Sequence, residues 1–175
     1  MDADAEALYR EFVAAELHPL LRTAYLLCGC RHTAEDLVQT TFVALYRAWS
    51  RLDSWGDPHA YARRTLTNAF LSARRRRSAQ EQLFAELPQP RRNGSPAPDE
   101  CASVDERERQ RELLRRLPPR QRAVLVLRFW EDYSVADTAE LMGVTAGTVK
   151  SQTAAALATL RRTLGTEPAK EPSHD

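Results

Sequence analysis

Apolar residues recur every three or four positions along two stretches of this chain, which is the spacing of amphipathic helices. In the first stretch, this spacing predicts helices at about residues 5–28 and 33–52, and a third helix at about 58–77. The alternation of apolar and polar positions that is typical of strands is found nowhere in the sequence. Residues 1–77 are therefore predicted to form one small helical domain.

Residues with known preferences for helix ends mark the borders of these three helices. Thr33 and Asp36 have the spacing of a capping box at the expected start of the second helix. Asp57 is suited to cap the third helix, with Pro58 in its first turn. The residues between the second and third helices, 53–58, are expected to form a loop.

The helical periodicity disappears over residues 78–106, where prolines stand among polar residues. Such a composition is typical of a flexible linker. Helical spacing returns in residues 107–164, and residues 165–175 are polar and are expected to be a disordered tail. The predicted fold class is all-α, with two small helical domains joined by a flexible linker.

The second domain carries the pattern of a helix-turn-helix. Ser134 and Asp137 suit a capping box at the start of a short helix that Gly143 ends. Ala139, Gly143 and Val149 supply a small contact residue, a glycine for the tight turn and an apolar plug in the next helix. An ordinary helical hairpin is the alternative. In a helix-turn-helix the second helix enters the major groove, and its candidate base-contacting residues here are Thr145, Thr148, Lys150, Ser151 and Gln152.

Composition places the chain among globular proteins, because 43% of its residues are apolar and 28% are charged. No apolar run approaches the ~20 residues of a membrane span, and the acidic N-terminal stretch is unlike a signal peptide. Three cysteines do not indicate a disulfide framework and fit a reducing compartment. We therefore expect a cytoplasmic protein that does not contact a membrane.

The net charge of +1 hides an uneven distribution of charged residues. Residues 1–77 hold 11 basic and 9 acidic residues, 78–106 hold 2 and 6, and 107–164 hold 11 and 6. Two basic domains joined by an acidic linker suit two surfaces that touch one polyanion. Basic faces are also common on solvated surfaces, so the charge alone leaves both interpretations open.

The third helix combines arginines with groups that recognise bases. One of its faces carries an aromatic ring, an amide and two arginines, from Tyr61, Arg64, Asn68, Leu71 and Arg75. Phosphates attract guanidinium groups, bases stack on aromatic rings, and an amide can read a base edge. Trp55, next to Gly56 in the preceding loop, could hold an unstacked base. The alternative is a solvated run of charge.

Three segments together resemble a known family. "AEDLVQTTFVALYRAW" (34–49), "PHAYARRTLTNAFLSARRRR" (58–77) and "LPPRQRAVLVLRFWEDYSVADTAELMGVTAGTVKS" (117–151) are similar to regions 2.2, 2.3–2.4 and 4 of the extracytoplasmic-function (ECF) group of bacterial sigma-70-type factors. The resemblance implies a subunit that binds core RNA polymerase, directs it to promoters and assists DNA melting. It implies no enzymatic activity of the chain itself.

The resemblance also implies partners and site residues. The partners are core RNA polymerase, through its β′ clamp helices and β subunit, promoter DNA and an anti-sigma factor. The helix that docks on the β′ clamp helices corresponds to Asp36, Leu37, Val38, Gln39 and Phe42, although Phe42 also lies on the predicted core stripe. Residues for the non-template strand of the −10 element are Trp55, Tyr61, Arg64, Asn68, Leu71, Arg74 and Arg75. The −35 element corresponds to Thr145, Thr148, Lys150, Ser151 and Gln152.

The chain departs from the family pattern in the helix expected to bind the −35 element. Family members usually place basic residues where this chain has Gln152 and Ala155. Because each lost phosphate contact lowers affinity and its salt dependence, we expect modest −35 binding or a larger share for Arg128 and Lys150.

No catalytic constellation, metal site or cofactor motif is predicted. Cys28, Cys30 and His32, with Cys101 as a distant fourth, are a weak candidate because zinc ligand pairs are normally spaced more widely than Cys-x-Cys. Two other functions remain as alternatives. One is a stand-alone helix-turn-helix transcriptional regulator, and the other is a helical protein-interaction module.

Overall fold

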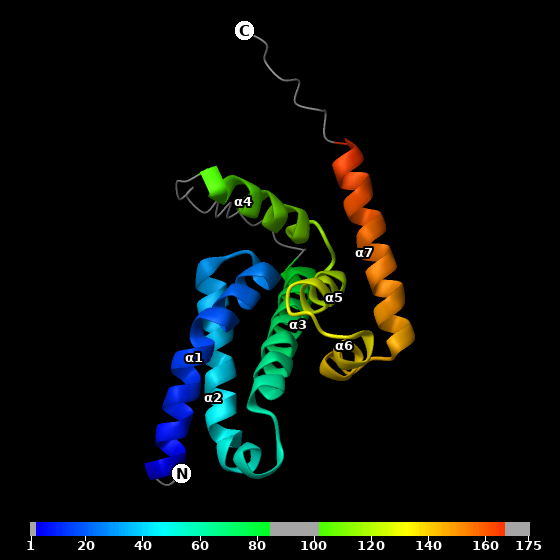
Figure 1. Ribbon diagram of the computed structural model, residues 1–175. Coiled ribbons are helices and arrows are strands. Elements are labelled where there is room, and N and C mark those ends of the chain that lie inside the picture. Colours follow the sequence, from blue (N-terminus) through cyan, green and yellow to red (C-terminus); the bar gives the residue numbers. More distant parts are fainter. Residues whose placement is uncertain (1–2, 85–101, 167–175) are drawn as a thin grey trace.

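The computed structural model describes residues 3–84 and 102–166, which form seven α-helices and contain no strand (Figure 1). The helices are α1 (Ala3–Cys28), α2 (Arg31–Trp55), α3 (Pro58–Phe84), α4 (Ala102–Arg115), α5 (Pro119–Phe129), α6 (Val135–Met142) and α7 (Ala146–Thr166). The all-α prediction is confirmed. None of these helices is both long and apolar enough to cross a bilayer.

The borders of α2 differ from those predicted. The helix begins at Arg31, so Thr33 and Asp36 lie inside it and the predicted capping box is wrong. It continues to Trp55, which leaves Gly56 and Asp57 to connect α2 to α3 in place of the longer predicted loop.

The start of α3 is as predicted. The carboxylate Oδ1 of Asp57 accepts a hydrogen bond from the backbone N–H of His59 at 2.8 Å, which caps the helix.

The helices extend into the predicted linker from both sides. α3 runs on to Phe84, and α4 begins at Ala102. Residues 78–84 lack proline and glycine, so nothing in this stretch stops a helix even though its apolar stripe has ended. The rest of the linker, 85–101, and the tail from 167 onward lie outside the described residues.

The predicted helix-turn-helix is confirmed in α6 and α7. The hydroxyl of Ser134 accepts from the N–H of Asp137 at 3.1 Å, and the Asp137 carboxylate accepts from the N–H of Ser134 at 3.2 Å. Gly143 has a φ of 63°, the left-handed conformation that glycine adopts at little cost. Ala139 and Val149 are buried together against Val124 of α5. Their small and apolar side chains allow the two helices to pack closely.

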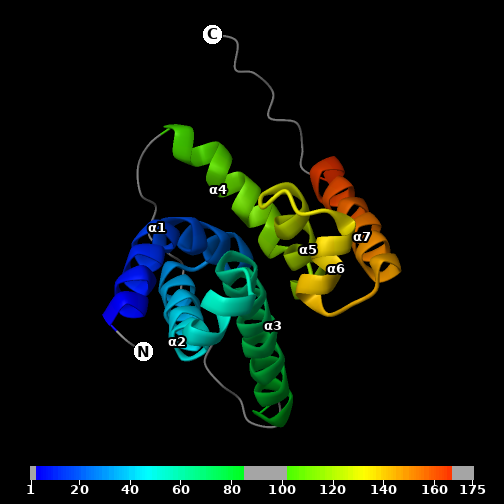
Figure 2. The same ribbon diagram turned by 60° about the horizontal axis from the view of Figure 1, so that its bottom comes forward.

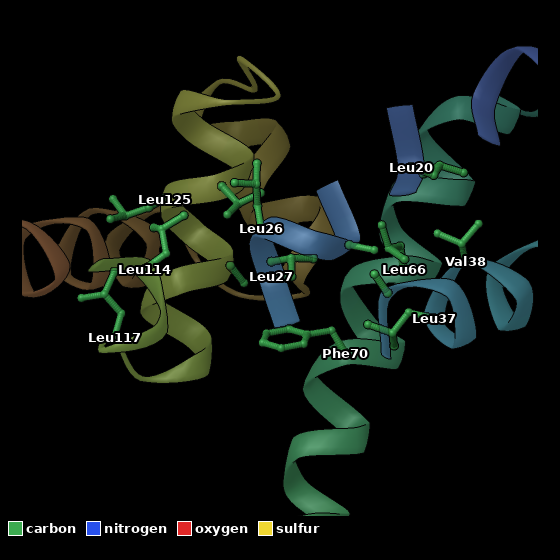
Figure 3. Packing of buried hydrophobic residues seen from close by; sticks show 14 of the residues in the cluster. Leu20, Leu26, Leu27, Leu37, Val38, Leu66, Phe70, Leu114, Leu117 and Leu125 are labelled. Carbon is green, nitrogen blue, oxygen red and sulfur yellow. The ribbon is translucent and has the colours of Figure 1, made fainter. Parts of the chain in front are cut away.

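Both groups of helices contribute to one hydrophobic core. α4 and α5 contact α1, and α5 and α6 contact α3 (Figures 1 and 2). Leu26 and Leu27 at the end of α1 lie among Leu114, Leu117 and Leu125 of α4, its following turn and α5 (Figure 3). The two predicted domains are therefore packed against each other. Burial of each such leucine stabilises the folded chain by about 1.5–3 kcal/mol.

Candidate polymerase and nucleic-acid interfaces

An open apolar groove lies between α1 and α2 and encloses about 580 Å³. Its lining comes from aromatic, aliphatic and a few charged side chains, namely Tyr9, Leu17, Leu21, Glu35, Val38, Gln39, Phe42, Val43, Tyr46 and Arg47. We call it the α1–α2 groove. Val43 and Tyr46 are 47% and 49% exposed, which is unusual for large apolar side chains and leaves room for a partner.

The predicted polymerase-binding residues occupy different depths at this groove. Val38, Gln39 and Phe42 line it, whereas the Asp36 side chain is 63% exposed. Leu37 and Val38 are only 5% and 2% exposed and both belong to the core, so Leu37 supports the surface from below and Val38 reaches the groove only at its floor. Phe42 packs against the core and also lines the groove, so the two interpretations of this residue are compatible.

An aromatic cluster that the sequence did not reveal fixes one wall of the groove. The ring of Tyr9 meets those of Tyr46 and Trp49 edge to face, with both centroid distances at 5.2 Å. The Tyr9 hydroxyl donates to the Phe42 carbonyl at 2.9 Å, and burial, followed by the charge of Tyr46, raises the pKa of Tyr9. The position of Tyr46, four residues after Phe42, was the signal in the sequence for a shared face.

The predicted −10 residues that the structure describes lie on α3. They are spaced by three and four residues on one continuous helix, so Tyr61, Arg64, Asn68, Leu71 and Arg75 share a face. Arg64, Asn68, Arg74 and Arg75 are exposed, and Tyr61 and Leu71 are half-buried. The side chain of Trp55 lies outside the described residues.

The start of α7 presents the predicted −35 residues. Lys150 and Ser151 are exposed, whereas Gln152 and Thr148 are half-buried. The hydroxyl of Thr145 accepts from the N–H of Thr148 at 3.1 Å and lies 2.9 Å from its hydroxyl, so it caps the helix as predicted. The Ser151 hydroxyl also donates to the Thr148 carbonyl at 3.0 Å, so the exposed Lys150 is the most available of these side chains for a base edge.

The α3 face and the helix-turn-helix lie on opposite sides of one cavity of about 630 Å³, here called the inter-region cavity. α3 contributes Asn68, Leu71, Arg74 and Arg75 to its lining. The other side is formed by Pro118, Pro119, Arg120, Gln121, Met142, Val144 and Gln152. Two predicted DNA-binding surfaces thus face each other in this structure.

Comparison with known proteins gives the family. Residues 12–80 match the Sigma-70 region 2 family, and residues 107–160 match the Sigma-70, region 4 family. The chain is 35% identical over 156 residues to the RNA polymerase sigma-E factor of Streptomyces coelicolor, covering 89% of this chain and 85% of that one. It is 33% identical over 146 residues to the ECF RNA polymerase sigma factor SigM of Mycobacterium tuberculosis, covering 83% and 71%. The chain belongs to the ECF group of RNA polymerase sigma factors.

Solved structures of similar fold support the all-α architecture of this sigma factor. The sigma factor RpoE of Bartonella quintana, in complex with the anti-sigma factor NepR, is 26% identical with a TM-score of 0.65, covering 91% of this chain and 98% of that one. CnrH, in complex with the cytosolic domain of CnrY, supports the fold at 22% identity and a TM-score of 0.61. The match to region 2 explains the first half of the chain, so a stand-alone helix-turn-helix regulator is not favoured.

The sigma factor also contains a buried cluster of charges that sequence reasoning missed. The guanidinium of Arg63 donates through Nη1 to Glu16 and through Nε to Glu131, both at 2.8 Å. His59 Nδ1 lies 3.0 Å from the same Glu16 carboxylate. Burial acts to lower the pKa of Arg63, but hydrogen bonds and charges from the two carboxylates outweigh it and raise the pKa. Glu16 is 8% exposed and the side chains of Arg63 and Glu131 are 14% and 15% exposed, whereas the His59 side chain is 54% exposed and forms the solvent side of the cluster.

A second buried arginine, near the start of α5, connects that helix to the C-terminal ends of α1 and α4. Arg122 is 5% exposed, and its guanidinium donates to the carbonyls of Leu27 at 2.6 Å, Arg115 at 2.8 Å and Leu117 at 3.2 Å. The last carbonyls of a helix lack hydrogen-bond donors within the helix, and the Arg122 guanidinium supplies those donors. Burial, followed by the charge of Arg74, lowers the pKa of Arg122 to about 10.

Proposed function

We propose that this sigma factor binds core RNA polymerase through the α1–α2 groove, directs it to promoters through α3 and α7, and assists DNA melting. It acts in the cytoplasm and is not an enzyme by itself. The observation that carries the proposal is the open apolar groove, because predicted polymerase-binding residues on α2 form part of its lining.

The chemistry of the α1–α2 groove suits a helical partner. An amphipathic helix lays its apolar side chains into such a groove and keeps its charged side chains at the rim. Val38, Phe42 and Tyr46 supply the apolar floor and wall, while Glu35 and Arg47 supply charge of both signs at the lining. The β′ clamp helices of the polymerase are the helical partner that the family relationship indicates.

The α3 face suits a single strand. Its arginines attract phosphates, Asn68 offers a donor and an acceptor to an unpaired base, and Tyr61 offers a ring for stacking. Stacking on the Tyr61 ring requires an unstacked base, so we propose that α3 holds the non-template strand of the −10 element while the duplex opens.

The start of α7 suits duplex DNA. Lys150 is the one basic residue among the predicted −35 contacts, and Arg161 and Arg162 lie near the far end of the helix. Fewer phosphate contacts reduce the affinity and its dependence on salt. We therefore propose that −35 recognition contributes modestly and that the α3 face carries more of the promoter affinity.

An anti-sigma factor is a further proposed partner. The similar structure of the sigma factor RpoE, at 26% identity, was solved in complex with the anti-sigma factor NepR. An exposed apolar groove needed for the polymerase is also a surface that an inhibitor can cover.

Binding of purified core RNA polymerase tests the proposed docking surface. Tyr46→Ala and Asp36→Lys are each expected to weaken core binding by about tenfold, since central aromatic and charged contacts contribute about 1–2 kcal/mol or more. Leu164→Ala is the control, because Leu164 is similarly exposed, at 50%, but lies on α7. Equal affinity of all three variants and the unmodified chain would remove the groove from the interface.

A further inference from the structure

The inter-region cavity has the size of a site for a small molecule. It encloses about 630 Å³, within the range of about 300–1,000 Å³ that is usual for ligand pockets. Region 2 here comprises α1–α3 and region 4 comprises α4–α7. α3 of region 2 supplies one side of the cavity, and α5–α7 of region 4 with their turns supply the other. The two sides are neighbours because α3 contacts both α5 and α6 (Figure 2).

The cavity carries positive charge on both sides. Arg74 and Arg75 come from α3, and Arg120 comes from the first turn of α5. In the described part of the chain no acidic side chain lines the cavity, and none forms an ion pair with these three arginines. All three are exposed, so an anion reaches their guanidiniums without breaking an ion pair. Phosphate is the anion that suits guanidinium groups best, because it accepts two parallel hydrogen bonds from each.

The start of α5 adds to this attraction for an anion. Pro119, Arg120 and Gln121 are the first three residues of the helix, and all three line the cavity. The N-cap is Pro118, which makes no side-chain hydrogen bond to the first turn. The first N–H groups of a helix lack acceptors within it and favour a negative group. Phosphate in the cavity therefore meets the arginines and a helix N-terminus together.

Gln121 brings a hydrogen-bond acceptor that lacks a donor. Its Oε1 is buried, and no group within residues 3–84 and 102–166 donates to it. A buried acceptor without a donor destabilises a folded protein. The side chain as a whole is half-buried and lines the cavity, so rotation about its soft terminal torsion turns Oε1 toward a ligand there. This favours a ligand that carries an N–H or O–H donor as well as an anion.

Apolar side chains complete the lining. Leu71 comes from α3, Pro118 and Pro119 from the start of α5, and Met142 and Val144 from the two sides of the helix-turn-helix turn. Met142 and Val144 are half-buried and pack against the core of that motif, which holds them in place. Proline rings and a methionine thioether pack well on a flat ring. This part of the cavity suits an aromatic ring system.

We propose that the inter-region cavity binds a nucleoside di- or triphosphate. The arginines of both regions and the start of α5 hold its phosphates, and the apolar side chains hold its base. The amides of Asn68, Gln121 and Gln152 offer donors and acceptors to the edge of the base. The bound nucleotide contacts region 2 and region 4 at once and stabilises the chain in this arrangement. This site goes beyond the proposed promoter recognition, because it requires neither DNA nor polymerase.

The test titrates three probes into the full chain by isothermal titration calorimetry, at about 0.15 M salt and without DNA. Adenosine 5′-diphosphate carries both the phosphates and a base, whereas adenosine lacks the phosphates and inorganic pyrophosphate lacks the base. The diphosphate is expected to bind at one site and at least about tenfold more tightly than either fragment, since each fragment loses half of the contacts. It should also raise the melting temperature of the chain.

The variants change the region 4 side alone, because the α3 side is also proposed to bind the −10 strand. Arg120→Ala is expected to weaken binding of the diphosphate about tenfold through loss of a charge-assisted contact. Arg161→Ala is the control, because Arg161 is an exposed arginine of α7 that does not line the cavity, and it should leave the affinity unchanged. Gln121→Leu should weaken binding about threefold to tenfold with no loss of melting temperature, since it removes a buried acceptor that lacks a donor.

Three results would overturn the inference. The first is the absence of saturable binding of the diphosphate to the unmodified chain. The second is pyrophosphate binding as tightly as the diphosphate, which would show that the cavity does not hold the base. The third is an equal effect of Arg120→Ala and Arg161→Ala, which would show attraction to surface charge in general. None of them touches the proposed sigma activity, which promoter-specific transcription with core polymerase measures separately.

Discussion

Arg63 and Glu131 form a 2.8 Å ion pair across 68 residues of sequence, one on α3 of region 2 and the other beside the helix-turn-helix of region 4. The pair connects the two regions through side chains that are only 14% and 15% exposed. Its position means that a buried ion pair helps to fix how region 4 packs on region 2.

Arg122 is expected to be irreplaceable by lysine. An ammonium group keeps the cost of burying a charge but cannot reach three carbonyls with the geometry of a guanidinium fork. Arg122→Lys should lower the free energy of unfolding by about 2–3 kcal/mol, measured by urea denaturation. Arg120→Lys, at an exposed position two residues earlier, should stay within about 0.5 kcal/mol of the unmodified chain. Equal losses in both variants would contradict the assigned hydrogen bonds.

The turn of the helix-turn-helix offers a matched pair of glycines. Gly143→Ala should cost about 1–2 kcal/mol, because φ is 63° there and no heavy atom lies within 4 Å of the new Cβ, so only backbone strain acts. Gly147→Ala, inside α7, meets only the Thr145 hydroxyl at 3.7 Å and should raise stability by up to about 1 kcal/mol. Thermal unfolding measures the change in stability of each variant. A Gly143→Ala variant as stable as the unmodified chain would contradict the left-handed conformation of Gly143.

The alkylation rates of Cys28 and Cys30 are expected to depend differently on pH. The backbone amide and hydroxyl of Thr33 lower the pKa of Cys30, whereas burial raises the pKa of Cys28. Only the thiolate is alkylated, so Cys30 should react with iodoacetamide at a lower pH and faster than Cys28. Mass spectrometry in a Cys101→Ser background follows both sites. Faster alkylation of Cys28 near neutral pH would show that the assigned surroundings are wrong.

Asn68 is expected to matter for strand opening more than for polymerase binding. It is exposed on α3 and far along the chain from the α2 residues that line the α1–α2 groove. Asn68→Ala should reduce open-complex formation about tenfold, measured by permanganate reactivity of promoter thymines, since a base-specific amide contact contributes about 1–3 kcal/mol. Core affinity should be unchanged, and an equal loss of both would contradict the role of Asn68 in holding a base.

Local sequence signals predicted the helix-turn-helix closely. The pairing of Ser134 with Asp137, the left-handed Gly143 and the buried Val149 each depend on residues within a few positions of one another. The start of α2 was predicted less well. Thr33 and Asp36 have the spacing of a capping box, but helix formation from Arg31 onward leaves both residues in the first turns of the helix.

Long-range features left no periodic signal in the sequence. Glu131 was one acidic residue among many, and Arg122 was one of several arginines in an amphipathic segment. Their partners, Arg63 and the carbonyl of Leu27, become neighbours only when region 4 packs on region 2. Similarly, Leu37 and Val38 are adjacent in sequence, yet only Val38 lines the α1–α2 groove, because the position of α1 decides which side of α2 is covered.

Run-off transcription with purified core RNA polymerase tests the central claim most directly, using promoter fragments from the genome that encodes this chain. The account predicts promoter-specific transcripts that require the added chain and decrease when Asp36→Lys or Asn68→Ala replaces it. Active core polymerase that yields no specific transcript with the unmodified chain on any such fragment would contradict the account.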